Sequence, residues 1–435
     1  MLIATTALVA LAAAPQSFTA QRAAAAGPDP GSTRLLMTPS GAPSIPDQPF
    51  LFGGGVASGD IDRDGDQDLV IATAAGPVVW DNAGAAGFVD ETSSRVPVSS
   101  GQCSNVVLED VNDDGWLDLI AVGTTSNRVD RVLANDRTGR FVLVADLPSA
   151  GAVTSGIAFV DVDGDGDRDL VRSIGSNGHV NEVGSDTLLA NDGAGNFSDV
   201  PGFQLASWND VSRPTTGVLA FDANGDGIED LLWLRADSST FTGSFGSRNS
   251  LVLGLGNGRF AEAPDALPDV EDNSYGAVAH DIDGDGDLDV VVSNVVLGVG
   301  SIQSADVLVN QGGAQGGVEG EFLERVGAIE EMPIPSEALR LGIVAGDIDL
   351  DGSLDVVFEV HDLPPGGNQP VYLGTPGTFS FGRLTTLATG TFIAGGATLF
   401  DADGDGDLDL FMTASGSAAG GSNPGAARLY RNTTR

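Results

Sequence analysis

The sequence predicts an all-β fold built from seven similar units, and three observations indicate it. An acidic nine-residue pattern, D-x-[DN]-x-[DN]-G-x-x-D, occurs seven times, at intervals of 50 to 66 residues. Most copies are followed by a short apolar run with the length of a buried strand. Glycine is frequent (61 of 435 residues), whereas only 6% of residues are aromatic. This composition is typical of many short strands joined by tight turns, and a repeat takes precedence over chain length in counting domains.

The nine-residue pattern is a candidate site for a hard cation. Ca²⁺ takes six to eight oxygen ligands, mostly carboxylates and carbonyls. Side chains at positions one, three, five and nine and the carbonyl of position seven could converge on one ion, because glycine at position six permits a sharp turn. The candidate ligands are Asp60, Asp62, Asp64, Asp66 and Asp68; Asp110, Asn112, Asp114, Trp116 and Asp118; Asp161, Asp163, Asp165, Asp167 and Asp169; Asp222, Asn224, Asp226, Ile228 and Asp230; Asp281, Asp283, Asp285, Asp287 and Asp289; Asp347, Asp349, Asp351, Ser353 and Asp355; and Asp401, Asp403, Asp405, Asp407 and Asp409.

A solvated turn and an EF-hand are the two alternatives to such a site. A solvated Asp-Gly turn is common in hairpins, but seven copies with one internal spacing argue against it. An EF-hand needs a glutamate at position twelve and flanking helices, and no copy has an acid at position twelve. Crowded, flexible sites made only of oxygen suit Ca²⁺ better than Mg²⁺, so we expect up to seven Ca²⁺ ions.

Each unit is expected to contain four strands. A strand with glycine five residues before the loop comes first (Asn105 replaces glycine in the second unit), and a second hairpin follows the apolar strand, as at 188–197. Four-stranded units in radial array form a β-propeller, here with seven blades; a calcium-binding β-helix would have a much shorter period. The last unit ends at its third strand, so we predict that residues 33–38 pair as the outer strand of blade seven and close the ring.

The segment from Gly55 to Val70 resembles an FG-GAP (VCBS-type) repeat, as found in the seven-bladed propeller of integrin α subunits, and Phe52-Gly53 matches the start of that motif. The resemblance covers residues 50–431 and implies that the loop residues named above ligate calcium. Only some integrin blades carry such loops, whereas all seven units do here, so the chain is more similar to secreted bacterial FG-GAP proteins. That group has mixed functions.

The formal charge of −41 excludes some partners. The seven nine-residue windows hold 32 of the 61 acidic residues, so the acidity belongs mainly to the candidate metal loops. No basic stripe is available for phosphates, which argues against nucleic acid. Cys103 is the only cysteine; it cannot form an internal disulfide and is expected to be a small buried hydrophobe. We expect a monomer.

The N-terminal residues 1–26 are interpreted as a secretory signal peptide, which leaves one propeller domain over 27–435. Residues 2–14 are apolar and small residues follow, although no basic residue precedes Arg22. An N-terminal helix or a disordered tail is the alternative. Thirteen apolar residues are too few for a transmembrane segment. The predicted location is therefore extracellular or at the cell surface.

The predicted function is an extracellular recognition or adhesion module that binds a glycan or protein through the face opposite the metal loops. Variable connections gather there, and long loops on a rigid scaffold are where binding usually occurs. Blade four offers the richest set of candidates: Trp208, Asn209, Asp210, Arg213, Arg235, Phe241, Phe245 and Arg248. They could equally be ordinary loop residues. A structural matrix protein is the alternative function.

A propeller polysaccharide lyase or hydrolase is the third possibility. The three histidines, His179, His280 and His361, lie in no recognisable catalytic motif. The identifiable carboxylate clusters are assigned to metal. We therefore expect no enzyme activity.

Overall fold

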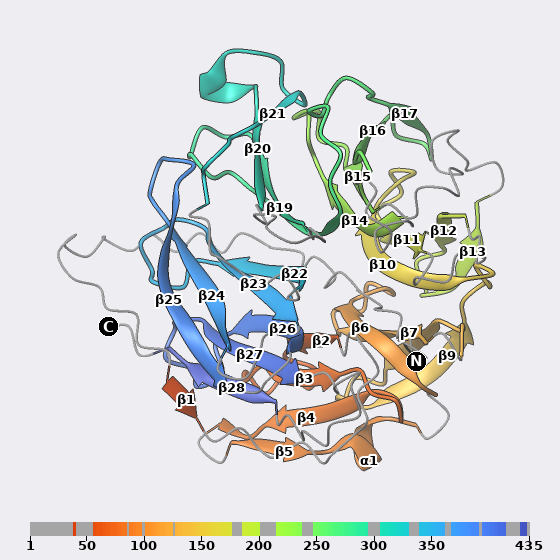
Figure 1. The fold of residues 1–435 in the computed structure, drawn as a ribbon. Coiled ribbons are helices and arrows are strands. Elements are labelled where there is room, and N and C mark those ends of the chain that lie inside the picture. The colour runs from red at the N-terminus through yellow and green to blue at the C-terminus, as the bar shows by residue number, and fades with distance from the viewer. Residues whose placement is uncertain are drawn as a thin grey trace, which may run out of the picture.

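The computed structural model describes residues 38–40, 55–84, 87–97, 101–124, 127–175, 185–200, 215–236, 247–294, 305–329, 339–361, 367–390, 394–414 and 427–432. Seven four-stranded antiparallel sheets form a ring, so the predicted all-β, seven-bladed propeller is confirmed. Figure 1 shows the blades side by side around a central axis. The proposed signal peptide and the Phe52-Gly53 pair lie outside the described residues.

The first four blades each run from an inner to an outer strand along the chain. They comprise β2 (Val56–Gly59), β3 (Asp68–Ile71), β4 (Val78–Asn82) and β5 (Phe88–Asp90); β6 (Cys103–Glu109), β7 (Asp118–Gly123), β8 (Arg131–Asn135) and β9 (Phe141–Asp146); β10 (Val153–Val160), β11 (Asp169–Gly175), β12 (Thr187–Asn191) and β13 (Phe197–Asp199); and β14 (Thr215–Phe221), β15 (Asp230–Arg235), β16 (Ser250–Gly254) and β17 (Phe260–Glu262). A single helical turn, α1 (Thr92–Arg95), follows β5.

The remaining blades repeat this order, and the last one is completed from the other end of the chain. They comprise β18 (Ser274–His280), β19 (Asp289–Asn294), β20 (Asp306–Asn310) and β21 (Phe322–Glu324), with the 3-10 helix η5 (Gly313–Gln315) before β21; β22 (Leu339–Gly346), β23 (Asp355–His361), β24 (Gly367–Gly374) and β25 (Phe381–Gly390); and β26 (Ala394–Phe400), β27 (Asp409–Ala414), β28 (Arg428–Arg431) and β1 (Thr38–Ser40).

The N-terminal strand closes blade seven, as predicted, but at a shifted position. Strand β1 pairs with β28, with Thr38 opposite Arg431 and Ser40 opposite Leu429. The strand therefore begins at the last residue of the predicted segment 33–38, whose other residues lie outside the described part. A three-residue edge strand needs little apolar surface, so its position leaves only a weak sequence signal.

The hydrophobic core is divided among the junctions between blades. Seven clusters of buried side chains each combine residues of two neighbouring blades, including blades seven and one. At that closing junction Trp80 packs edge-on against Phe411, with ring centroids 6.2 Å apart. Because each blade buries its faces only against its neighbours, the junction that closes the ring forms a hydrophobic cluster of its own, as each of the other six junctions does.

The glycine before six of the seven acidic loops marks the crowded inner strands, as the sequence predicted; Asn105 occupies this position in blade two. A Cβ added at Gly156 would lie 2.9 Å from Gly217 Cα, and one at Gly276 would lie 3.3 Å from Gly342 Cα. Side chains would separate these inner strands. Cys103 is buried, as expected, and burial raises the pKa of its thiol to about 12.

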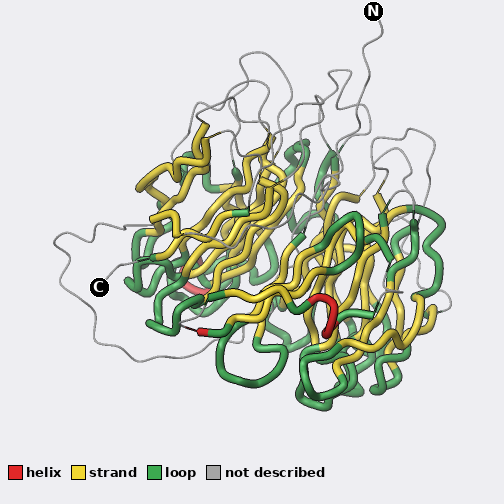
Figure 2. The backbone as a smooth tube through the Cα atoms, turned by 90° about the horizontal axis from the view of Figure 1, so that it is seen from below, coloured by secondary structure: helices red, strands yellow, loops and turns green. Residues whose placement is uncertain are grey.

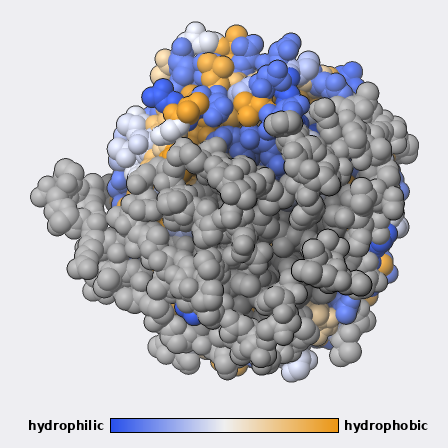
Figure 3. All heavy atoms as spheres, viewed as in Figure 1, coloured by the Kyte–Doolittle hydropathy of each residue, from blue (hydrophilic) through white to orange (hydrophobic). Residues whose placement is uncertain are grey.

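All seven acidic loops lie on one face of the ring, because each joins the first strand of its blade to the second. This face is the lower side in Figure 2. Where the described surface is visible in Figure 3, hydrophilic residues predominate and hydrophobic ones are interspersed. Within the described residues, no helix is long and apolar enough to cross a membrane.

Candidate metal centres

The backbone of the acidic loops is held by the aspartate at position one. Its carboxylate accepts a hydrogen bond from the glycine N–H at position six in all seven loops, over 2.6–3.2 Å. Position six has positive φ throughout, and so does position four, even where it is Arg63, Asp113 or Leu350. Left-handed backbone at both positions folds five residues around one carboxylate.

The aspartate at position nine fastens the loop to the blade. One carboxylate oxygen accepts the N–H of position two (2.7–3.2 Å) in every loop. The other oxygen accepts an N–H at the end of the third strand (2.6–2.9 Å). Each oxygen keeps a further lone pair that could face a cation.

Burial controls the ionisation of these position-nine carboxyls. It raises the pKa of Asp68, Asp289 and Asp355 to about 7, against the lowering effect of the backbone hydrogen bonds. Burial also raises the pKa of the other four carboxyls to about 6; these are Asp118, Asp169, Asp230 and Asp409. A carboxylate that is shielded from water and has negative neighbours favours a proton or a metal ion.

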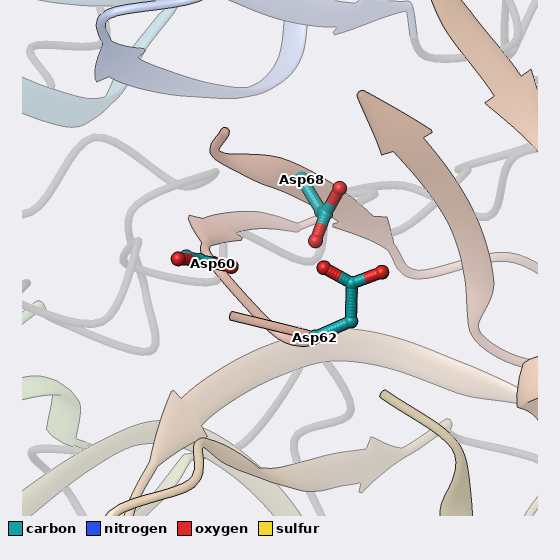
Figure 4. A group of neighbouring side chains, drawn as sticks. All are labelled: Asp60, Asp62 and Asp68. Carbon is teal, nitrogen blue, oxygen red and sulfur yellow. The ribbon is translucent and has the colours of Figure 1, made fainter. Parts of the chain in front are cut away.

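Five loops bring three acidic side chains together. In the described part of the chain, one oxygen from each member lies within 4.8 Å of the others in the sets Asp60, Asp62 and Asp68; Asp161, Asp163 and Asp169; Asp281, Asp283 and Asp285; Asp347, Asp349 and Asp351; and Asp401, Asp403 and Asp409. Figure 4 shows the first set, in which the carboxylates of Asp62 and Asp68 face one another beside Asp60. The loops that form no such set are the second and fourth, which carry Asn112 and Asn224 at position three.

The donor atoms of these loops fit a divalent cation. Asp287 and Asp407, both at position seven, are only 4% and 3% exposed. Neither oxygen of either carboxylate has a hydrogen-bond partner among the described residues. A buried carboxylate without a partner is costly, and an ion bound by oxygen would satisfy it. The sequence predicts that the position-seven carbonyl faces the ion, and these two side chains are candidate ligands beside it.

In three of the loops an arginine pairs with a candidate ligand carboxylate. Arg95, at the end of α1, contacts Asp62 over 2.7 Å and Asp81 over 2.5 Å. Arg137 contacts Asp114 over 3.0 Å, and Arg431 pairs with Asp403. Each guanidinium neutralises part of the negative carboxylate charge that would otherwise attract a cation to the loop.

An asparagine that the sequence reasoning missed joins each of five loops to the next blade. The side-chain Nδ2 of Asn82, Asn135, Asn191, Asn310 and Asn432 donates to the position-two carbonyl of the preceding blade's loop, over 2.7–3.2 Å. We call these residues the asparagine latches. Blades four and six have Gly254 and Gly374 at this position, and in blade four the Gly258 N–H donates to Val162 O instead (2.8 Å). Asparagine at the end of the third strand is the signal that could have revealed them.

The opposite face carries little of the predicted ligand set within the described residues. Arg235 is buried, and its Nε donates to Ser250 Oγ. Arg248 donates to the carbonyls of Pro264 and Leu267. The other six members of the set lie outside the described residues, as does His179.

The other two histidines stand at strand ends. His280 is the last residue of β18, beside the fifth loop as expected; burial lowers its pKa, and Asp281 and Asp347 oppose that effect. His361 ends β23.

Comparison with known proteins agrees with this architecture. A family model described as an FG-GAP-like repeat matches residues 60–121, 110–172 and 239–292. A lectin from Agrocybe aegerita, solved for its specific recognition of non-reducing terminal N-acetylglucosamine, is 18% identical with a TM-score of 0.50, covering 77% of this chain and 81% of the lectin. The BBS1N chain solved in complex with ARL6DN is 11% identical with a TM-score of 0.54, covering 92% and 97%. At these identities the likeness concerns the fold, and no curated protein sequence matches.

Proposed function

The chain is an FG-GAP repeat propeller protein, and we propose that it binds calcium through its acidic loops and acts as a secreted recognition module stiffened by that calcium. The observation that carries the metal assignment is the pair of buried aspartates, Asp287 and Asp407, whose carboxylate oxygens have no hydrogen-bond partner among the described residues. Several carboxylate oxygens crowded into one loop favour Ca²⁺, which takes six to eight oxygen ligands, over Mg²⁺, which demands a tighter octahedron and usually keeps several waters.

The proposed ligands are the residues at positions one, three, five, seven and nine of each loop, in up to seven sites. Bound calcium would neutralise carboxylates that otherwise repel one another within nine residues. Positions one and nine are already oriented by backbone N–H groups, so binding would order little additional chain. The loops with three clustered carboxylates are expected to fill before the second and fourth loops.

The recognition role rests on the ring and its connections. A rigid scaffold with variable connections on one face is suited to binding, and a lectin of the same fold recognises a terminal sugar. We propose a glycan or an extracellular protein as the ligand, the opposite face as the binding surface, and a monomeric, non-catalytic domain over residues 27–435 after removal of the signal peptide.

Calcium binding is tested by counting the ions on the chain from Gly27 with native mass spectrometry. We expect several Ca²⁺ per chain, and fewer in the double variant Asp287→Asn/Asp407→Asn. Asp199→Asn, an exposed aspartate outside the loops, is the matched control. A chain that is folded but retains no calcium at millimolar concentration would contradict the metal assignment.

Recognition is tested by binding to a glycan and matrix-protein array in millimolar Ca²⁺, with a chelated sample beside it. A defined calcium-dependent hit that is weakened by Trp208→Ala would support the opposite face as the binding surface. A blank array from a folded, calcium-loaded sample would favour the structural matrix role instead.

A further inference from the structure

The connection between the third and fourth strands is much longer in blade five than in its neighbours. Asn310 ends β20 and Phe322 begins β21, so eleven residues lie between them. In blades one to four the same connection has five residues, and in blade six it has six. These connections lie on the same face as the acidic loops. In an antiparallel blade the third strand runs in the same direction as the first, so both strands end at the same face.

The long connection folds back onto the fifth acidic loop. The Ala314 N–H donates to Asp285 Oδ2 over 2.5 Å, and Gln315 Nε2 donates to Asp283 Oδ2 over 2.8 Å. The connection is itself ordered: Gln315 N donates to Gly312 O, and the latch residue Asn310 accepts the N–H groups of Gly312 and Gly320. A compact turn is therefore held directly over the carboxylates.

Four side-chain oxygens of the fifth loop and this turn are buried without hydrogen-bond partners among the described residues. They are Asp283 Oδ1, both carboxylate oxygens of Asp287, and Gln315 Oε1. Asp287 is 4% exposed and has Asp285 and Asp283 as charged neighbours. Four buried acceptors without a donor are unfavourable in the absence of an ion, and oxygen atoms of this kind are the ligands that a hard divalent cation takes.

The fifth loop also differs from those that carry an arginine. In loops one and seven the position-three aspartates, Asp62 and Asp403, pair with Arg95 and Arg431. In loop five the corresponding Asp283 meets the neutral amide of Gln315. No positive charge has to be displaced from that contact, and the amide brings an additional oxygen.

From these contacts we propose that the 311–321 connection is a lid on the fifth loop, and that Gln315 Oε1 is a calcium ligand supplied from outside the nine-residue pattern. The fifth site then binds its ion more tightly and releases it more slowly than the other six. This inference rests on the proposed calcium binding by the loops.

The test measures calcium affinity and release in the full chain from Gly27. Calorimetric titration gives the tightest class of sites, and stopped-flow mixing with a fluorescent chelator gives its release rate. Gln315→Ala should weaken that class about tenfold, as loss of a supporting contact at a metal site commonly does, and should speed release of one ion. Gln311→Ala is the matched control, because Gln311 lies in the same connection but its amide donates to Val309 O.

A tight class that is weakened in Gln315→Ala and intact in Gln311→Ala supports the lid. An unchanged tight class in Gln315→Ala, or equal losses in both variants, overturns it while leaving calcium binding by the loops in place. A wild-type chain that binds no calcium overturns the proposed function itself. Circular dichroism of each variant confirms that it is folded.

Discussion

Replacing the latch residue Asn135 with alanine should destabilise the ring through one blade junction. Asn135 is 4% exposed. Its Nδ2 donates to Ile61 O over 2.8 Å and to Leu117 O over 3.1 Å. Its Oδ1 accepts the N–H groups of Arg137 and Gly139 over 3.0 and 3.1 Å. One side chain thus connects loop one, loop two and the turn of its own blade.

The magnitude follows from these four hydrogen bonds. Each contributes about 1 kcal/mol net, and a buried group left without a partner costs about 1–3 kcal/mol. Ile61 is fully buried, so its carbonyl would stay unsatisfied, whereas the groups near the exposed turn can regain water. We therefore expect Asn135→Ala to lower the free energy of unfolding by about 2–4 kcal/mol.

The assay is reversible denaturation in urea at saturating Ca²⁺, followed by circular dichroism. Asn196→Ala is the control, because the side chain of this exposed asparagine in the equivalent turn of blade three bonds, among the described residues, to Asp192 alone; it should leave the free energy of unfolding unchanged. A loss below about 1 kcal/mol for Asn135→Ala would refute the reasoning, because it would mean that the latch can be replaced by water.

Three further outcomes are expected. Chelation should lower the melting temperature markedly, since each site at a hundredfold excess over Kd adds about 2.7 kcal/mol to the native state; a melt that does not change would contradict calcium stabilisation. Arg95→Ala should raise the calcium affinity of loop one about fivefold, or ~1 kcal/mol, by removing a positive charge beside Asp62, and calorimetry showing no change would argue against competition between this arginine and the ion. Glu359→Gln should stabilise the protein at pH 8 but not at pH 5. Burial raises the pKa of Glu359 to about 7 from an ordinary 4.5, so the native state binds more protons between those values and loses stability as pH rises through them, by at most about 3 kcal/mol. Equal effects of Glu359→Gln at both pH values would contradict this assignment.

The fold was predictable because one short pattern fixes most of it. Seven acidic loops at similar intervals gave the number of blades, and the glycine before six of them, such as Gly156, marked the crowded inner strand. The four strands of each blade follow from two hairpins. What the pattern did not contain was the exact position of β1, a three-residue edge strand.

The contacts that hold the loops were harder to predict. The latch residue follows position nine by 14 residues in blade one and by 22 in blade three (Asn82 after Asp68, Asn191 after Asp169), so no fixed spacing reveals it. The left-handed backbone at position four cannot be predicted from the sequence where that position is not glycine, as at Leu350. The contact between Gln315 and Asp283 spans 32 residues and depends on a single insertion.

The positions of each acidic loop divide between two tasks. Positions one, five and nine accept backbone N–H groups in all seven loops, so they shape the loop whatever else it binds. Positions three and seven vary: position three is Asn112 or Asn224 in two loops, where the amide oxygen still accepts the position-five N–H, and position seven varies from Asp287 to Trp116 and Ile228. A loop can therefore lose charge at positions three and seven without losing its conformation. This explains how the second and fourth loops keep the same hydrogen bonds as the others although they lack the cluster of three carboxylates. The affinity for the proposed calcium ions can consequently differ between blades while the geometry of the ring stays the same.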